Sequence, residues 1–218
     1  MNLVNELQVS AEQDDVLTVL RKTMRLASKL GRDDISAWLE AEQSGYPDNR
    51  DVPEYRKVGT TLAYKTNGYI PAGYGQLMNG VEDLPSLDVT CPMPVRESIS
   101  VVLTWIESLG KGHGIYFPIP AGSDYNRSIR TIVRFNPTIE RQITLLIHLN
   151  ESQIRAIPDR IKDKVLQWSL ALERAGVTGE GMTFSAKDKE IAQRVTWNIY
   201  GSHIEQLNNS GINWKGSQ

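Results

Sequence analysis

The stretch that decides the fold is Trp38-Leu-Glu-Ala-Glu-Gln-Ser-Gly-Tyr-Pro-Asp-Asn-Arg-Asp-Val-Pro-Glu-Tyr-Arg56, in which a helix end runs into a loop bounded by two prolines. Gly45 suits the left-handed conformation that closes a helix, because it has no Cβ atom. Pro47 and Pro53 cannot lie inside helices, and the polar residues between them favour turns. The stretch therefore predicts a short helix followed by an exposed but stiffened loop.

A second helix is predicted upstream of this stretch. From about residue 13 to residue 30, apolar residues recur at steps of three and four, namely Leu17, Leu20, Met24 and Ala27. Gly31 is expected to end that helix, and Asp33 is expected to cap the next one. The inward-facing residues of the next helix are expected to be Ile35, Trp38 and Leu39. Residues 13–45 therefore predict a helical hairpin.

The rest of the chain mixes both kinds of secondary structure. Short β-branched or aromatic segments predict strands within 57–70, 115–119, 128–135 and 142–149. Helices are predicted from Pro94 to Gly110, from Asn150 to Gly176 with a break or kink at Pro158, and from the capping box Ser185–Asp188 to Gly201. The Gly- and Pro-rich segment 71–92 predicts a long ordered loop. The fold class is α+β, with an N-terminal helical hairpin, several further helices and a small, mostly antiparallel sheet.

Bulk properties narrow the class of protein. Of the 218 residues, 40% are hydrophobic and 23% are charged, which is typical of a globular chain. The formal net charge of −2 provides no overall electrostatic field that would attract nucleic acid or an anionic membrane. Cys91 is the only cysteine, which excludes an internal disulfide and a multi-cysteine zinc site. The start resembles no secretory leader, and no apolar run is long enough to span a membrane. We expect a soluble cytoplasmic protein with no membrane partner.

No set of residues predicts a reaction. His113, His148 and His203 lie far apart in sequence, without the spacing of paired metal ligands. Gly110-Lys-Gly-His-Gly114 lacks the Lys-Ser/Thr ending of a phosphate-binding loop and follows a helix, so a helix-terminating turn is expected there. We therefore predict no catalytic residue, no metal ligand and no cofactor, and an enzymatic role is not favoured.

The order of helical hairpin, Gly-Tyr-Pro and Val-Pro-Glu-Tyr-Arg resembles the AbiTii family, a group of bacterial abortive-infection proteins associated with resistance to phages. The carrying residues are Leu20–Gly31, Trp38-Leu39, Glu42, Gly45–Asp48, Pro53–Arg56, Glu173, Gly179–Met182, Phe184-Ser185 and Asn198–Gly201. Gln43 and Ser44 depart from the family's usual leucine and asparagine, and the middle third matches only loosely. The resemblance implies a role in antiviral defence and a domain over residues 1–201. The remaining residues 202–218, with Asn208-Asn-Ser-Gly211 between short mixed segments, predict a small hairpin or a tail. The resemblance carries over no catalytic residue.

The proline-bounded loop is the predicted binding site. Tyrosine rings with polar tips, restrained by prolines, suit recognition at a low cost in conformational entropy. The predicted binding residues are Trp38, Glu42, Tyr46, Pro47, Pro53, Tyr55 and Arg56. A structural alternative stays open, in which the tyrosines cap the core beneath the hairpin and Arg56 pairs with Glu42 or Glu54.

The leading functional hypothesis is a phage-defence module that acts as a sensor or regulator through protein–protein association with an effector encoded elsewhere. One alternative is an enzyme of unknown reaction that acts on a nucleotide or nucleic acid, with its site between segment 71–92 and the tyrosine loop. Another is a non-catalytic nucleic-acid-binding module, which is not favoured. The tail after Gly201 is expected to add a strand to a second copy and so to give a homo-oligomer.

Overall fold

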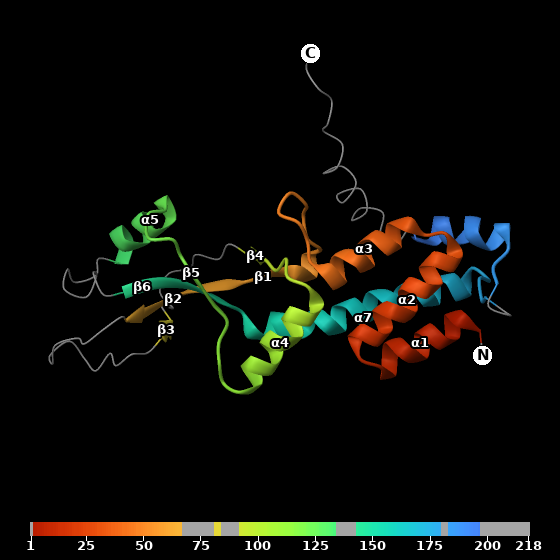
Figure 1. Ribbon diagram of the computed structural model, residues 1–218, viewed down its shortest axis with the longest axis horizontal. Helices are drawn as coiled ribbons and strands as arrows, with labels where there is room; N and C mark the ends of the chain where they lie inside the picture. The colour runs from red at the N-terminus through yellow and green to blue at the C-terminus, as the bar shows by residue number, and fades with distance from the viewer. Residues whose placement is uncertain (1, 67–80, 84–91, 134–142, 180–182, 197–218) are drawn as a thin grey trace, which may run out of the picture. The chain divides into compact units, whose positions relative to one another are not determined.

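The computed structural model describes residues 2–66, 81–83, 92–133, 143–179 and 183–196 (Figure 1). The fold is α+β with helices at the N-terminus and a small antiparallel sheet, which confirms the predicted class. The chain divides into two compact units. Unit 1 comprises the described residues of Met1–Lys57, Pro94–Ile106 and Arg155–Gln218, and unit 2 those of Val58–Met93 and Glu107–Ile154.

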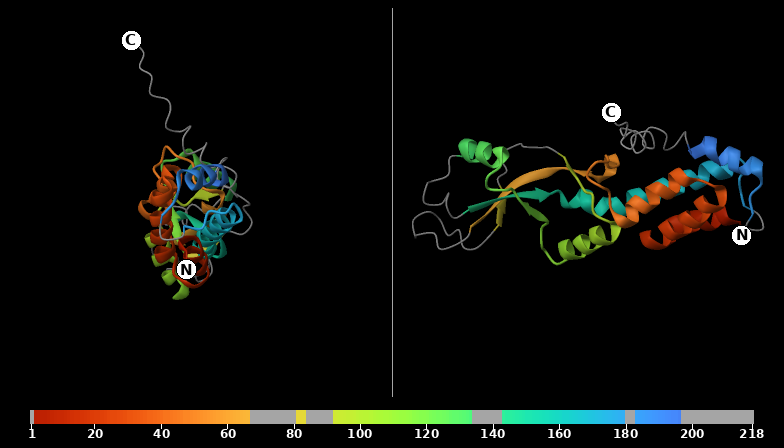
Figure 2. Two further views of the ribbon diagram at one scale, coloured as in Figure 1. Left: turned by 90° about the vertical axis from the view of Figure 1, so that its right-hand side faces the viewer. Right: turned by 45° about the horizontal axis from the view of Figure 1, so that its top comes forward.

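Unit 1 begins with three helices, α1 (Leu3–Gln13), α2 (Val16–Leu30) and α3 (Asp33–Ser44). α2 packs against both α1 and α3, and the three helices can be followed side by side in Figures 1 and 2. The hairpin of α2 and α3 confirms the sequence prediction, whereas α1 was not predicted. Gly31 ends α2 with φ +66° and ψ 40°, the left-handed conformation that glycine adopts without strain. The buried face of α2 is Val16, Val19, Leu20, Thr23, Leu26, Ala27 and Leu30.

The ends of α3 differ from the prediction in detail. Arg32, not Asp33, occupies the N-cap position, and it makes no side-chain cap hydrogen bond. Asp33 lies instead in the first turn, where a carboxylate interacts favourably with the positive end of the helix dipole. Gly45 at the other end has the expected positive φ of +100°, but its ψ of 160° lies outside the left-handed helical region that was predicted.

Two further elements follow in unit 1. The 3-10 helix η1 (Glu54–Arg56) closes the proline-bounded loop, and α4 (Ile99–Gly110), which belongs to unit 1 as far as Ile106, begins well after Pro94. The prediction that Pro94 starts this helix is wrong, because Met93–Pro94 form the short strand β4, and the next amide, that of Val95, donates to the Arg56 carbonyl at 2.8 Å. β4 pairs with β1 (Lys57–Val58) in a separate two-stranded sheet.

α7 (Glu151–Arg174) contributes its residues from Arg155 onward to unit 1 and continues through Pro158 without a break. Residues 186–196 form a further helix. Its capping box is confirmed, since the Ser185 amide donates to Asp188 Oδ2 at 2.8 Å and the Asp188 amide donates to Ser185 Oγ at 3.1 Å. The predicted end of this helix at Gly201 and the tail 202–218 lie outside the described residues.

Unit 2 contains a four-stranded antiparallel sheet of order β3-β2-β6-β5. The strands are β2 (Thr60–Thr66), β3 (Val81–Asp83), β5 (Tyr116–Pro118) and β6 (Ile143–Leu149). The two longest, β2 and β6, pair from Thr60 opposite Leu149 to Thr66 opposite Ile143. β2, β5 and β6 confirm predicted strands. β3 was not predicted and lies within the segment 71–92 that was expected to be a loop, most of which is outside the described residues.

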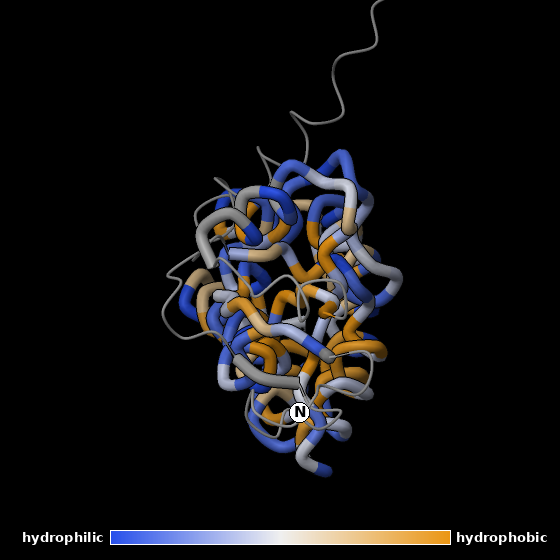
Figure 3. The backbone as a smooth tube through the Cα atoms, turned by 90° about the vertical axis from the view of Figure 1, so that its left-hand side faces the viewer, coloured by the Kyte–Doolittle hydropathy of each residue, from blue (hydrophilic) through white to orange (hydrophobic). Residues whose placement is uncertain are grey.

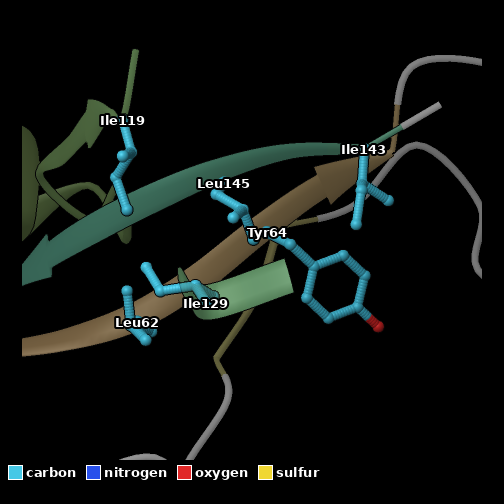
Figure 4. Close-up of a cluster of buried hydrophobic side chains, with 6 residues drawn as sticks. All are labelled: Leu62, Tyr64, Ile119, Ile129, Ile143 and Leu145. Carbon is cyan, nitrogen blue, oxygen red and sulfur yellow. The ribbon is translucent and has the colours of Figure 1, made fainter. Parts of the chain in front are cut away.

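The predicted strand 128–135 is wrong, because α5 (Asp124–Val133) covers its described part. Ser123 Oγ accepts the Asn126 amide at 3.1 Å, and the Asn126 carboxamide accepts Arg130 Nε at 2.7 Å one turn later. Figure 4 shows Ile129 of α5 beside Leu62 and Leu145 of the sheet, in a cluster with Tyr64, Ile119 and Ile143. Burying one face against the sheet favours a helix here despite the β-branched residues.

Figure 3 shows hydrophilic and hydrophobic residues alternating along the backbone tube in short stretches. In α1, α2 and α3 the apolar stretches contribute most of the buried residues of each helix, and polar residues lie between them.

Candidate functional site

The predicted loop lies over a buried carboxylate. Glu42 belongs to the last turns of α3, and its side chain is fully buried, with 0% exposure. Its Oε1 atom accepts hydrogen bonds from two phenol groups, Tyr46 Oη at 2.6 Å and Tyr55 Oη at 2.6 Å. The two tyrosines come from opposite ends of the proline-bounded loop, so one carboxylate oxygen joins both ends.

Arg56 provides the opposite charge. Its guanidinium is also fully buried and donates to Glu42 Oε2 through Nε at 3.0 Å and through Nη2 at 2.5 Å. The Arg56 Cζ atom lies 5.2 Å from the centroid of the Tyr46 ring, within the range of a cation–π contact. A buried charge pair needs such complete hydrogen bonding, because each ion has lost its water.

Trp38 extends the network on the helix side. Its indole Nε1 donates to Tyr55 Oη at 3.0 Å, so the Tyr55 hydroxyl accepts one hydrogen bond and donates another. Trp38 is 2% exposed, and Tyr55 is half-buried. We call the group Trp38, Glu42, Tyr46, Tyr55 and Arg56 the buried network.

The network keeps its two phenol groups and its guanidinium group protonated. Burial raises the pKa of Tyr46 and of Tyr55 well above the ordinary value of 10.0, and the charge of Glu42 raises the pKa of both further. Burial alone would lower the pKa of Arg56, but the charge of Glu42 and its hydrogen bond outweigh burial and raise the pKa. Both phenols therefore stay protonated and act as donors at neutral pH, and Arg56 stays a cation.

Two arginines join the loop to a segment far along the chain. Arg56 Nη1 donates to the carbonyl oxygens of Val95 at 3.2 Å and Glu97 at 2.7 Å. Conversely, Arg96 Nη1 donates to the carbonyl oxygens of Pro47 at 2.8 Å and Arg50 at 2.5 Å. We call these four bonds the reciprocal arginine contacts. They hold the backbone of residues 47–56 and that of residues 95–97 in a fixed position relative to each other within unit 1.

Gly45 lies where the backbones of the two segments are in close contact. The Tyr46 amide donates to the Arg96 carbonyl at 2.7 Å, and a Cβ atom at Gly45 would lie 3.0 Å from that carbonyl oxygen. Since φ is also +100° there, an L side chain would be strained in both respects. Glycine is thus required by geometry at this position.

The outer surface of the loop is a different set of residues. Pro47, Asp48 and Asn49 are exposed, and the Asp48 side chain is 104% exposed. Beside them lies an open hollow of about 490 Å³ lined by Ser44, Gly45, Tyr46, Pro47, Arg96, Glu97, Ser98 and Val101. The buried network therefore forms a solid base, and the exposed tip and the hollow form the accessible surface.

The structure brings the predicted site residues together but places most of them inside. Trp38, Glu42, Tyr46, Pro53 and Arg56 are buried, and only Pro47 is exposed. Of the two pairings that the structural alternative allowed, Arg56 makes the one with Glu42. Glu54 instead accepts a hydrogen bond from Lys57 Nζ at 2.6 Å, which raises the pKa of Lys57.

Arg96 was missed by sequence reasoning. It stands some forty residues beyond the loop, and no local pattern links it to Pro47 or Arg50. Its two carbonyl contacts depend on the long-range approach of the chain and are visible only in the structure.

Among the residues that the structure describes, no group of three or more His, Cys, Asp or Glu side chains lies close enough to hold a metal ion. No described helix combines the length and the apolar character needed to cross a membrane.

Comparison with protein families identifies a relationship over most of the chain. The model of the AbiTii family matches residues 2–196, which cover the loop, the buried network and Arg96. No curated protein and no solved structure matches the chain significantly.

Proposed function

This chain belongs to the AbiTii family, and from that premise we propose that it acts as a sensor or regulator that associates with a protein effector encoded elsewhere. The family's name suggests a role in abortive infection, an antiviral defence.

The observation that carries the proposal is the preorganised loop. Arg96 holds the carbonyl oxygens of Pro47 and Arg50, and the buried network fixes both ends of the same loop. Ordering a loop on binding costs free energy, so a loop that is already fixed binds a partner at lower cost. A stiff exposed tip on a solid base is what a recognition surface requires.

The predicted binding residues divide into two roles under this proposal. Pro47, with its neighbours Asp48 and Asn49, is exposed and can contact a partner. Pro53 and the network residues Trp38, Glu42 and Arg56 are buried and cannot reach a partner without unfolding, and they instead hold the tip in position. Substitutions in the exposed tip should therefore weaken partner binding without a change in stability. Substitutions of the buried residues should lower the stability of the protein.

The test captures partners from cells. The full chain carrying an affinity tag is expressed in bacteria with and without phage infection, cross-linked and purified after nuclease treatment. We expect a protein that is recovered reproducibly with the wild type and lost with Asp48→Arg. Asp163→Arg on α7 is the matched control, since Asp163 is also an exposed carboxylate of unit 1, and it should retain the partner.

Phage plating on the same strains completes the test. The proposal is contradicted if the wild type confers resistance while no protein is recovered with it, or if Asp48→Arg retains both partner and resistance. Material that is recovered only without nuclease would favour the nucleic-acid-binding alternative instead.

A further inference from the structure

The hollow beside the loop contains an exposed apolar side chain. Val101, in the first turn of α4, is 40% exposed. Only Val9 on α1 matches it among the large hydrophobic side chains of the described residues, also at 40%. Val101 and the ring of Pro47 thus provide an apolar surface inside a hollow of about 490 Å³, which accepts a few side chains of a partner.

The walls of the hollow are held in place by contacts already described. Tyr46 is bonded through its hydroxyl to Glu42 and through its amide to the Arg96 carbonyl. Arg96 is anchored to two carbonyl oxygens of the loop. The hollow therefore keeps its form without an occupant, as preorganised binding sites do.

The most exposed charged side chain next to the hollow is a carboxylate. Asp48 follows Pro47 of the lining directly in sequence and its side chain is fully exposed, whereas Glu97 of the lining is half-buried. The cation of the lining, Arg96, has a side chain that is 26% exposed, and its Nη1 atom donates to two main-chain carbonyl oxygens. Its Nε atom lies 3.8 Å from Asp48 Oδ1. The acidic side chains of the loop are also more exposed than its basic ones. Asp51 and Glu54 are exposed, whereas Arg50 and Lys57 are half-buried.

We propose that this hollow is the docking site for a segment of a partner protein that carries an aliphatic side chain beside a lysine or arginine. The aliphatic side chain contacts Val101 and Pro47, and the basic side chain pairs with Asp48 and Glu97. The inference rests on the proposed function, because it names the surface and the chemistry through which a partner would associate.

The first experiment identifies the chemistry directly. The full chain, immobilised, selects from a displayed library of random peptides. We expect the enriched peptides to share a lysine or arginine next to leucine, isoleucine or valine. Enrichment of peptides without a basic residue would overturn the proposal, and so would an absence of enriched peptides.

Two variants locate the binding, and one variant controls for it. Val101→Asp should raise the dissociation constant of the enriched peptides about tenfold or more, because it puts a charge where an apolar contact is expected. Asp48→Arg should raise it by a similar factor, because it reverses the charge of the exposed side chain next to the hollow. Val9→Asp, at equal exposure on another helix, should change the dissociation constant by less than about twofold. Both target side chains are exposed, and an acidic residue is favourable in the first turn of a helix, so folding should be retained.

The outcomes separate this proposal from the one on which it rests. If Val101→Asp binds the peptides as the wild type does, the docking site is wrong. If light scattering finds a dimer that Val101→Asp dissociates, the occupant is a second copy and the proposed partner is wrong. If wild-type cells resist phage and Val101→Asp cells resist equally, the defence role stands and the docking site falls. If wild-type cells show no resistance, the defence role falls whatever the peptides do.

Discussion

Replacing Glu42 by glutamine should lower the free energy of unfolding of unit 1 by about 3 kcal/mol, near the lower end of the range for breaking a buried ion pair. The substitution keeps the size and shape of the side chain and removes its charge. Arg56 would then be a fully buried cation without its counter-ion. One amide group would also face donors that now point at Glu42, from Tyr46 and Tyr55 on one side and from Arg56 on the other.

Two opposing contributions determine the expected decrease in the free energy of unfolding. Loss of the charge removes a partner from a guanidinium that burial has stripped of water, which costs several kcal/mol. Arg56 keeps its bonds to the Val95 and Glu97 carbonyl oxygens, which limit the loss. A decrease of about 3 kcal/mol changes the equilibrium between open and closed forms by about two orders of magnitude.

Native-state hydrogen exchange measures the effect where it arises. The amides of Tyr46 and Val95 bond across the two joined segments, so their exchange should accelerate about a hundredfold in Glu42→Gln. Glu54→Gln is the control, because Glu54 is 85% exposed and its pair with Lys57 lies at the surface. It should leave both amides almost unchanged.

A double-mutant cycle checks the physical reason. If the lower free energy of unfolding comes from a buried Arg56 cation without its counter-ion, Arg56→Gln should lower that free energy less in the Glu42→Gln background than in the wild type. Additive losses, or an effect of Glu42→Gln no larger than that of Glu54→Gln, would refute the reasoning.

The other predictions concern the same unit. The raised pKa values of Tyr46 and Tyr55 mean that the stability they contribute is complete below pH 10.0 and is lost as pH rises above it. In denaturation series at alkaline pH, Tyr46→Phe should therefore reduce the slope of that loss by about 1.4 kcal/mol per pH unit, and an unchanged slope would contradict it. Gly45→Ala should lower the thermal midpoint more than Gly31→Ala, because only the first places a Cβ atom 3.0 Å from a carbonyl oxygen, and equal shifts would argue otherwise. Asp15→Ala should cost about 1 kcal/mol by removing the cap of α2. Because the pKa of Asp15 is lowered by its hydrogen bonds to Thr18, its charge-dependent contribution is present above pH 3.8 and lost as pH falls, whereas Asp15→Asn should show no such loss in acid denaturation.

Much of the fold could be predicted because local signals were strong. The apolar stripe of α2, the stop at Gly31 and the capping box at Ser185 each depend on residues only a few positions apart. α5 was mistaken for a strand because β-branched residues favour strands when considered alone. Its actual state depends on Ile129 packing against sheet residues that lie elsewhere in the sequence.

The candidate site divides in the same way. The sequence left two partners open for Arg56, Glu42 and Glu54, because both carboxylates lie within fourteen residues of it, and the structure shows the pair with Glu42. The role of Arg96 was not anticipated, because its two carbonyl acceptors lie 49 and 46 positions away. Burial could not be predicted either, since a tyrosine beside a proline is compatible with both a recognition surface and a core.

The reciprocal arginine contacts also bear on how the protein could be divided. They join residues before 67 to residues after 92 within unit 1, and the ladder between β2 and β6 does the same within unit 2. Peptide-bond continuity between residues 67 and 80 is thus not needed to keep the flanking parts together. Two halves produced separately, divided in that interval, should assemble without a covalent link, which would make phage defence switchable by supplying the missing half.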